Sequence, residues 1–361
     1  MEKIKIIASN KSWIEQNAVE QLKGIVSLKG MIRAVGLPDL HPGKTPVGAA
    51  FVSEEMIYPH IIGNDIGCGM SLFMIDVKKH KLKKDKWMKK LENNLNNKDI
   101  FIEDSLEDTI PFKEKMGTIG GGNHFAEFQE IEKVLDEESF EKLGLSKKHL
   151  YLLVHSGSRG YGENILDEAI KKYQAQKGLK IGAVEAEAYL KKHDDAIVWA
   201  ENNRKMIAYR LMDLLGIGMN RVLDSTHNSI VKKVIQDKEV YIHRKGAAPA
   251  DVGAVVIPGS RGDLTYIVMP KSSYVSAYSI AHGAGRKWSR GGCKERLINK
   301  YTKKTIKQTQ LGGNVICKDK NLLFEEAPEV YKNIEKVIKD LLEADLIEVI
   351  ATLKPVITYK G

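Results

Sequence analysis

The sequence predicts a mixed fold of the α+β class, in which a single domain spanning residues 1–361 has β-sheets flanked by helices. Three observations support this prediction. The chain is long enough for one large domain, and 43% of its residues are hydrophobic, which suffices for a sizeable core. Strand and helix patterns alternate irregularly, which argues against the regular βαβ cadence of a doubly wound parallel sheet. No internal repeat or low-complexity linker marks a domain boundary.

The first half of the chain shows strand, helix and loop signals in turn. Ser12 followed by Glu15 has the spacing of a capping box, so we expect a helix to open there. The stretch LPDLHPGKTPVG at 37–48 is rich in Pro and Gly and predicts a structured loop. Hydrophobic periodicity predicts strands at 3–9, 31–36 and 71–77, a buried strand from 150 that runs into a Gly-Ser loop, and helices at 13–28 and 83–98.

The second half contains one long helix and several short strands. Residues 184–215 keep helical spacing for about 30 positions. Shorter helices are expected at 286–308 and 328–343. Strands that end in loops are expected at 221–229, 239–246, 253–260 and 264–270.

The sequence indicates in which cellular compartment the protein is expected. No apolar run approaches the roughly 18 residues that a membrane span needs. The start, MEKIKIIASNKSW, lacks the regions of a secretory signal, so we expect a cytoplasmic protein without a membrane partner. Three cysteines, Cys68, Cys293 and Cys317, cannot form a disulfide framework. In a reducing compartment such cysteines are more often buried, catalytic or metal-bound.

The net charge of +9 favours a polyanionic partner, but only weakly. Much of the excess lies in residues 77–90 and 299–308. Either these runs are solvated helix faces, or they form an electrostatic funnel for nucleic acid.

The histidines fall into two groups. His80, His149 and His193 each follow two lysines, and we expect them on the surface. Five others lie beside Gly, Ser, Asn or Pro, mostly where a strand gives way to a loop, and strand-end loops are where sites are built on a rigid scaffold. These five are His41, His124, His155, His227 and His282.

Asp65 and Cys68 suggest what the loop histidines do. Thiolate, imidazole and carboxylate together are the ligand set of transition metals. Gly67 and Gly69 permit the tight turn that would aim Asp65 and Cys68 at one ion. With three histidines they would fill about two three-ligand sites with open positions, as catalytic sites have. The alternative is that Cys68 is a small buried apolar residue.

Two glycine-rich loops predict anion binding. GTIGGGNHF (117–125) and PGSRGD (258–263) resemble phosphate-cradling loops in composition, but neither is a P-loop or a dinucleotide fingerprint. Basic residues recur in the loops, and arginine binds phosphate bidentately. The loop residues are Lys44, Arg159, Lys245, Arg286 and Arg290. Together with a metal centre they suggest a phosphorylated substrate, although each arginine alone could be in a surface ion pair.

Several motifs occur together in a familiar order. They are PDLHPGK, GNDIGCGM, GTIGGGNHFAE, HSGSRG, HN, RKGA, PGSRG, HGAGRKWSR and the ending EEAPEVYKNIEKV…LKPVITYKG. In this order they resemble the RtcB family of RNA ligases, from about residue 31 to Gly361. The resemblance implies an enzyme that joins an RNA 3′-phosphate or 2′,3′-cyclic phosphate to a 5′-hydroxyl, using GTP and two Mn²⁺ ions. A histidine would attack the α-phosphorus of GTP and carry GMP, which would then pass to the RNA 3′-phosphate and be displaced by the 5′-hydroxyl.

The resemblance also implies roles for residues matched to the motifs. His282 would be the nucleophile and Asp39 would orient it. One manganese ion would be held by Asp65, Cys68 and His124, and the other by Cys68, His155 and His227, with Cys68 bridging. Asn123 and Asn228 would contact GTP phosphates, Glu127 and Lys360 would read the guanine edge, and Tyr331 would stack on guanine. Gly259, Ser260, Thr265, Ala284 and Gly285 would line the nucleotide pocket. Arg159, Lys245, Arg286 and Arg290 are candidates for phosphate and RNA contacts.

The chain departs from the family pattern at a few places. Thr45-Pro46 stands where another glycine is common, Asn64 replaces valine, Arg261 replaces methionine and Thr265 replaces serine. With the short chain, these features resemble a compact subgroup associated with a release-factor-like partner and with repair of ribosomal RNA. The expected protein is monomeric.

Two other functions are compatible with parts of the sequence. A two-metal RNA phosphodiesterase or other hydrolase would use the same ligands but would need neither a histidine nucleophile nor a guanine pocket. A non-catalytic RNA-binding protein would rest on the basic charge alone, and the sequence carries no RRM or KH signature.

Overall fold

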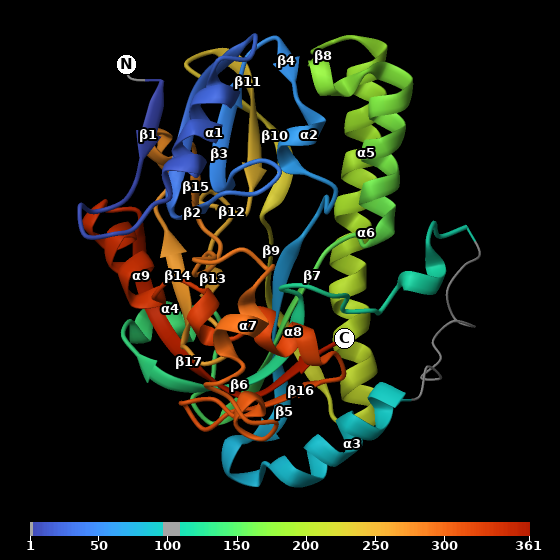
Figure 1. The fold of residues 1–361 in the computed structure, drawn as a ribbon, viewed down its shortest axis with the longest axis vertical. Helices are drawn as coiled ribbons and strands as arrows, with labels where there is room; N and C mark the ends of the chain where they lie inside the picture. Colours follow the sequence, from blue (N-terminus) through green and yellow to red (C-terminus); the bar gives the residue numbers. More distant parts are fainter. Residues whose placement is uncertain (1–2, 97–108) are drawn as a thin grey trace.

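A computed structural model describes residues 3–96 and 109–361 and contains two large, mainly antiparallel sheets (Figure 1). The first has the order β1-β2-β3-β11-β10. The second has the order β13-β14-β17-β6-β7-β5-β9, and β16 pairs with β17 outside this path. Parallel pairing joins β1 to β2 and β16 to β17. The mixed α/β fold predicted from the irregular alternation of strands and helices is therefore confirmed.

The strands and helices have the following bounds. The first sheet comprises β1 (Ile4–Ile6), β2 (Met31–His41), β3 (Val47–Ser53), β10 (Asn228–Ile235) and β11 (Lys238–Lys245). The second comprises β5 (Gly69–Lys78), β6 (Phe125–Val134), β7 (His149–Ser156), β9 (Met219–Thr226), β13 (Val255–Pro258), β14 (Thr265–Pro270), β16 (Asn314–Cys317) and β17 (Ile347–Lys360). Two short pairs are formed by β4 (Met56–Ile57) with β8 (Leu179–Lys180) and by β12 (Ala247–Pro249) with β15 (Ser279–Ala281). The α-helices are α1 (Gln16–Val26), α2 (Pro59–Ile62), α3 (Lys84–Asn96), α4 (Glu137–Lys142), α5 (Gly160–Tyr173), α6 (Val184–Leu215), α7 (Cys293–Leu297), α8 (Lys320–Glu325) and α9 (Ile334–Glu343).

The two sheets share a hydrophobic core. Val35 and Val52 of the first sheet belong to the same buried cluster as Ile257 and Val268 of the second, and α9 closes that cluster with Leu341. On the other side α6 lies along β5 and β7, with α5 beside it (Figure 1). Burying these apolar faces together fixes the relative position of the strand ends from which the loops project.

Several local predictions were wrong. The helix α1 begins at Gln16 with Glu15 as its N-cap residue and no side-chain cap, because the Ser12 hydroxyl instead faces the Ser9 hydroxyl at 3.2 Å. The segment 37–41, predicted as loop, belongs to β2, which is interrupted by an irregularity after Gly36 and pairs again at His41 with Val47.

The predicted helices near the C-terminus are shorter than expected. Within 286–308 only Cys293–Leu297 is α-helical, because the chain first makes a bridge from Arg286 to Tyr331 and then turns at Gly292 with a φ of 79°. The helix expected from 328 begins at Ile334, since the Asn333 side chain caps it by accepting from the Lys336 N–H. The helix expected at 83–98 is Lys84–Asn96, and its last two predicted residues lie outside the described residues.

The surface prediction for one histidine was also wrong. His193 is fully buried on α6, and its Nε2 accepts a hydrogen bond of 2.9 Å from the Ile230 N–H. His193 is buried because it lies on the inward face of the helix, and the two lysines before it do not change this.

The lysines of the run 77–90 are mostly exposed around the buried Trp87, and neither basic run lines the large cavity described below. Their positions favour solvated faces over a funnel into that cavity. Within residues 3–96 and 109–361, no helix is both long and apolar enough to cross a membrane.

Two polar residues of α6 hold the strand ends together. Arg204 has no exposed surface. Its Nη1 donates to the carbonyls of Gly67 and Ser156 at 2.8 and 3.1 Å, and its Nε and Nη2 donate to the Asp224 carboxylate at 2.8 and 2.7 Å. Because Gly67 and Ser156 each neighbour a site residue, Arg204 fixes the spacing of the loops in front of it.

Asn203, the preceding residue on α6, holds a third loop. Its Nδ2 donates to the Ser156 hydroxyl and the Gly157 carbonyl at 3.1 Å, and its Oδ1 accepts from the Gly117 N–H at 2.7 Å. Gly117 opens the glycine-rich loop 117–125. Both residues follow the inward spacing of the helix, which is a signal that the sequence analysis did not use.

We expect Arg204→Leu to destabilise the protein strongly, by about 3–5 kcal/mol, because it leaves the Asp224 carboxylate, which is only 13% exposed, without the guanidinium that balances its charge. Arg221→Leu is the matched control, since its ion pair with Glu201 lies on the surface and should contribute less than about 1 kcal/mol. Denaturant unfolding followed by circular dichroism measures both changes. If both variants lost the same small amount of unfolding free energy, the hydrogen bonds of Arg204 would not contribute the predicted stability.

Candidate active site

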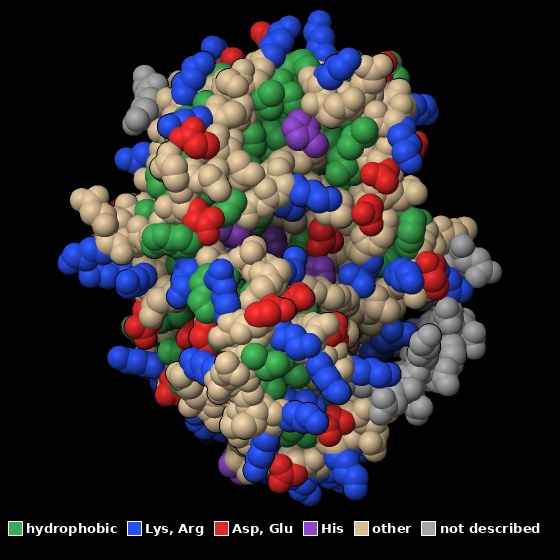
Figure 2. Space-filling model, viewed as in Figure 1, with side chains coloured by type: hydrophobic (Ala, Val, Ile, Leu, Met, Phe, Trp, Pro, Cys, Tyr) green, Lys and Arg blue, Asp and Glu red, His purple; other side chains and the backbone are tan. Residues whose placement is uncertain are grey.

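A cavity of about 980 Å³ opens where the loops of both sheets meet. Figure 2 shows it as the hollow at mid-height of this face, with histidine in its depth and Lys and Arg around it. Its lining includes all five loop histidines and most of the other predicted site residues: Asp65, Cys68, Asn123, Glu127, Asn228, Lys245, Gly259, Ser260, Ala284, Gly285, Arg286, Arg290, Tyr331 and Lys360. Asp39, Arg159 and Thr265 are not part of the lining.

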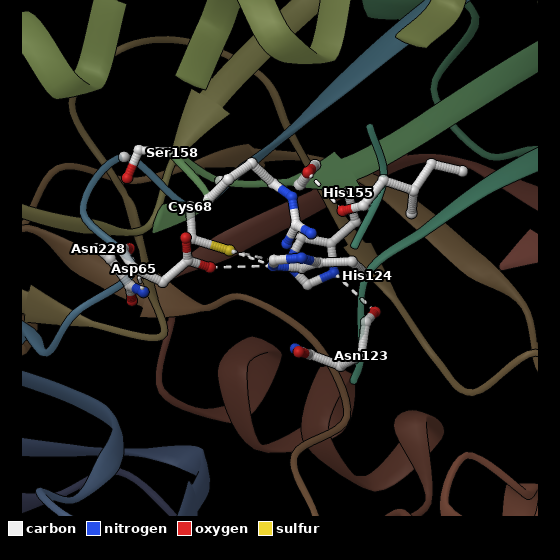
Figure 3. A network of polar contacts seen from close by, with 12 residues as sticks. Asp65, Cys68, Asn123, His124, His155, Ser158 and Asn228 are labelled. Carbon is white, nitrogen blue, oxygen red and sulfur yellow. Dashed lines mark hydrogen bonds and ion pairs between the residues drawn. The ribbon is translucent and has the colours of Figure 1, made fainter. Parts of the chain in front are cut away.

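Cys68 lies between two histidines (Figure 3). Its Sγ is 3.3 Å from the Nε2 of His124 and 3.3 Å from the Nε2 of His155. These three ligand atoms lie within 4.8 Å of one another. Asp65 joins them, because its Oδ2 is 3.0 Å from His124 Nε2. Thiol, two imidazoles and a carboxylate thus converge on one point, and this donor set fits a divalent transition metal.

The turn between Asp65 and Cys68 has the tight geometry that its glycines predict. The Cys68 N–H donates to the Asp65 carbonyl at 3.3 Å, and Gly67 has a φ of 77°. A Cβ at Gly67 would lie 2.8 Å from the Cβ of Ala200 on α6, so only glycine fits this turn against the helix. Asn64, one of the departures from the family pattern, donates from Nδ2 to Glu163 on α5 at 3.3 Å.

The backbone orients His155. Its Nδ1 lies 3.2 Å from the Asn123 carbonyl, and because a carbonyl can only accept, Nδ1 carries the proton. The Nε2 lone pair is then directed to the cluster, as a metal ligand requires. The His227 ring packs between His155 and His282, at centroid distances of 5.1 and 4.6 Å. The predicted division of ligands between two ions is compatible with this arrangement and stays a prediction.

Burial sets the charge of the cluster. It lowers the pKa of His155 and of His227 well below the usual range, and the neighbouring histidines add to this effect. It raises the pKa of the Cys68 thiol, with the nearby Asp65 adding to it. Burial would also raise the pKa of Asp65, but His124 outweighs it and holds that pKa at about 2. His155 and His227 are therefore neutral donors, and a metal would have to displace the thiol proton of Cys68.

Asp39 and His282 form a second unit beside the cluster. The His282 Nδ1 is 2.8 Å from the Asp39 Oδ2, and the His282 N–H donates to the same oxygen at 3.3 Å. Asp39 is fully buried. Since a carboxylate accepts, Nδ1 carries the proton and Nε2 keeps its lone pair. The predicted orientation of His282 by Asp39 is therefore present as a contact.

Glu127 lies at another part of the cavity. Its carboxylate accepts from the Gln129 Nε2 at 2.7 Å and the Thr358 hydroxyl at 2.5 Å. Burial raises the pKa of Glu127 to about 7, although these two hydrogen bonds oppose it. Thr265 lies behind this residue, where its hydroxyl accepts from Gln129 at 2.8 Å, so it supports the pocket without lining it.

Glu326, which the sequence analysis missed, connects three residues of the cavity. It accepts from Arg286 Nη1 at 3.0 Å, from the Tyr331 hydroxyl at 2.5 Å and from Lys360 Nζ at 3.4 Å. Burial would raise the pKa of Glu326, but Lys360 and Arg286 outweigh it and keep the carboxyl ionised. The acidic pair at the start of the ending motif EEAPEVY was the only signal for it in the sequence.

The predicted phosphate-binding residues differ in whether other protein groups already bind their charged side chains. Arg286 is bonded to Glu326 and to the carbonyls of Glu325 and Trp288, so its charge is already matched. Arg290 reaches the glycine-rich loop, where a Cβ at Gly122 would lie 2.9 Å from its Nη2.

Arg159 and Lys245 both lie near enough to Asp65 and Cys68 to interact with their charges. Arg159 Nε donates to the Thr118 hydroxyl at 3.2 Å. Lys245 lines the cavity, and burial lowers its pKa, although the nearby Asp65 and Cys68 oppose this. Of these four basic residues, Arg290 and Lys245 are therefore the best placed to meet an anion in the cavity.

The remaining predicted residues hold the loops in place. Asn228 Nδ2 donates to the Asp65 carbonyl at 3.0 Å, and its Oδ1 accepts from the Gly246 N–H at 2.8 Å. The Ser260 hydroxyl donates to Asp263 at 2.5 Å. Arg261, a departure from the family pattern, is buried and donates to the Ile306 carbonyl at 3.0 Å, which ties the loop 258–263 to the turn beneath it.

Comparison with known proteins identifies the family of the chain. The family described as tRNA-splicing ligase RtcB matches residues 21–100 and 103–361. An RNA-splicing ligase RtcB2 from Escherichia coli is 46% identical over 98% of this chain and 95% of its own length. The tRNA-splicing ligases RtcB of Archaeoglobus fulgidus and Nanoarchaeum equitans are 28% and 26% identical, over 96% and 99% of this chain and 92% and 95% of their own lengths. The chain therefore belongs to the RtcB family of RNA-splicing ligases.

Proposed function

We propose that this ligase joins an RNA 3′-phosphate or 2′,3′-cyclic phosphate to a 5′-hydroxyl through a covalent GMP adduct on His282, with GTP and two Mn²⁺ ions. The observation that carries the proposal is the carboxylate-oriented imidazole in the same cavity as the cluster of Cys68, His124 and His155. An imidazole held by a carboxylate is a competent nucleophile toward phosphorus. A hydrolase would need the cluster but not this second unit.

A 2′,3′-cyclic phosphate would first be opened by water, which breaks the bond from phosphorus to the 2′-oxygen, and the 3′-phosphate would then react in three displacements. His282 Nε2 attacks the α-phosphorus of GTP, a nitrogen–phosphorus bond forms and pyrophosphate leaves. The proton on Nδ1 stays on the side of Asp39, whose carboxylate stabilises the positive charge that develops on the ring. An oxygen of the RNA 3′-phosphate then takes GMP from His282, and the 5′-hydroxyl displaces GMP as it forms the new phosphodiester.

The cluster residues Asp65, Cys68, His124, His155 and His227 would hold the manganese ions. Bound divalent metal neutralises phosphate charge and favours in-line displacement. The fixed Nε2 of His155 and the tight turn at Gly67 are the chain's own contribution, because they hold the donors in place before a metal arrives.

The guanine base would bind at the end of the cavity lined by Glu127, Tyr331 and Lys360. A carboxylate can accept hydrogen bonds from guanine N1 and N2, which adenine does not offer in the same pattern. Glu326 holds the Tyr331 hydroxyl and Lys360 in place, so that end of the cavity is ordered before a nucleotide enters. The repair of ribosomal RNA and the release-factor-like partner stay predictions from the family resemblance.

We expect His282→Ala to abolish the GMP adduct formed with α-labelled GTP and manganese. Asp39→Asn should slow its formation by about 10²–10⁴-fold, because the amide no longer stabilises the charged ring. Acid-labile label retained on the denatured protein measures the adduct, and His80→Ala, an exposed histidine outside the cavity, is the control. Absence of an adduct on folded wild-type protein would refute the proposal, and RNA cleavage that survives His282→Ala would favour a phosphodiesterase.

The metal ligands should differ in their effect on stoichiometry. We expect Cys68→Ala to lose both manganese ions, because its Sγ contacts both His124 and His155, whereas Asp65→Ala should mainly weaken one. Calorimetric titration with Mn²⁺ and elemental analysis after dialysis count the ions. Loss of a single ion in both variants would contradict bridging by Cys68.

GTP affinity should depend on pH through Glu127, whose pKa is raised to about 7. Only the carboxylate accepts from guanine, so affinity should fall as the pH drops below 7, approaching about tenfold per pH unit. Fluorescence titration with a labelled GTP between pH 5.5 and 8.5 measures this dependence. In Glu127→Gln the pH dependence should vanish together with the preference for GTP over ATP, and a variant that kept both would show that Glu127 does not read the base.

A further inference from the structure

His41 is the only one of the five histidines lining the cavity to which the family resemblance assigns no role. It ends strand β2 and is partly exposed. Its Nδ1 lies 2.8 Å from the backbone carbonyl of Asp39. Because a carbonyl oxygen can only accept, Nδ1 carries the hydrogen and Nε2 keeps a free lone pair. Among the described residues, Nε2 has no hydrogen-bond partner, so this lone pair is left for a ligand.

Asp39 therefore orients two imidazoles at once. Its carboxylate holds His282 and its carbonyl holds His41. Gly246 lies beside the His282 ring and beside Val47. A Cβ there would lie 3.0 Å from His282 Cε1 and 2.5 Å from a methyl of Val47, the residue that pairs with His41 across the strands.

Lys332 fixes the backbone around Asp39. Its Nζ donates to the carbonyls of Pro38 and Leu40 at 3.2 and 2.6 Å, and its N–H donates to the Gly285 carbonyl at 3.0 Å. The peptide that carries the Asp39 carbonyl is thus held on both sides. A histidine oriented this firmly, with an unused acceptor in a cavity, has the arrangement of a group that takes up a proton.

Resting on the ligase function proposed above, we propose that His41 is a second catalytic histidine, whose Nε2 accepts the proton of the RNA 5′-hydroxyl in the joining step. In that step the 5′-oxygen forms a bond to the 3′-phosphorus, and the bond from this phosphorus to the oxygen of GMP breaks. The hydroxyl proton moves to Nε2, GMP leaves with the electron pair of the broken bond, and the imidazolium then returns the proton to solvent.

The state of the ring is consistent with this role. Burial lowers the pKa of His41 to about 4, and although the bond to the Asp39 carbonyl opposes this, His282 and Lys332 add to it. The ring is therefore neutral near pH 7 and can accept a proton. The imidazolium formed would be a stronger acid than free imidazole, which favours prompt release of the proton after each joining event.

The test separates the two halves of the reaction. His41→Asn keeps an N–H donor at the position of Nδ1 and can retain the bond to the Asp39 carbonyl, but it lacks Nε2. We expect its GMP adduct to form within about threefold of the wild-type rate, while joining of an RNA whose 3′-phosphate was guanylylated in advance falls by about 10²–10⁴-fold. His149→Asn is the matched control, because its Nδ1 also has a partner, the Ser146 hydroxyl at 2.8 Å, and it does not line the cavity.

A second variant tests whether the loss of joining comes from the missing imidazole or from a disturbed structure. In His41→Ala the missing ring leaves space beside the cavity, and added imidazole should restore part of the joining rate. Wild-type joining of guanylylated RNA by His41→Asn would overturn the inference. So would equal losses in adduct formation and joining, since His41 would then act only through Asp39 and His282. Failure of the proposed function itself would look different, because the wild-type protein would then form no adduct at all.

Discussion

The buried guanidinium of Arg204 is the interaction on which the candidate active site depends. It donates to the Gly67 carbonyl, in the turn before β5, and to the Ser156 carbonyl, at the end of β7, and its charge is balanced by Asp224. Removing one partner of a buried ion pair is costly, because the other partner is then left desolvated and unpaired. The spacing of the cluster is therefore set from behind by a core helix and not by the cavity residues alone.

Asp39 performs a comparable task for the nucleophile. It is fully buried, yet it bonds outward through both its side chain and its carbonyl, so one short segment of β2 positions two histidines. Lys332 stabilises this segment from the C-terminal part of the chain. The irregularity in the pairing of β2 with β3 is what allows the segment to turn its polar groups toward these partners.

The end of the cavity assigned to the base is ordered by a third set of contacts. Glu326 lies among Arg286, Tyr331 and Lys360, and the Arg286 guanidinium lies 5.4 Å from the centroid of the Tyr331 ring. Such a satisfied network holds side chains rigidly, which lowers the entropy lost when a ligand binds. It also explains why Arg286 is a poor candidate for phosphate, since its charge is used inside the network.

The sequence by itself determined the fold class and the residue types of the site, because these depend on local patterns. The tight turn from Asp65 to Cys68 depends on the glycines within it. An apolar run followed by Gly, Ser and Pro indicates the end of a strand. Local patterns misjudged the capping box at Ser12 and the surface position of His193, where a neighbouring hydroxyl and the inward face of α6 prevailed. Only the tertiary structure decided that Arg204, Glu326 and Lys332 support the site, and that Asp39 serves two histidines. Most of their partners lie tens to hundreds of residues away, as with Lys332 and Leu40, so no spacing along the chain could reveal these hydrogen bonds. His41 and Tyr331 are close in sequence to Asp39 and Glu326, but a short separation does not by itself specify a hydrogen bond.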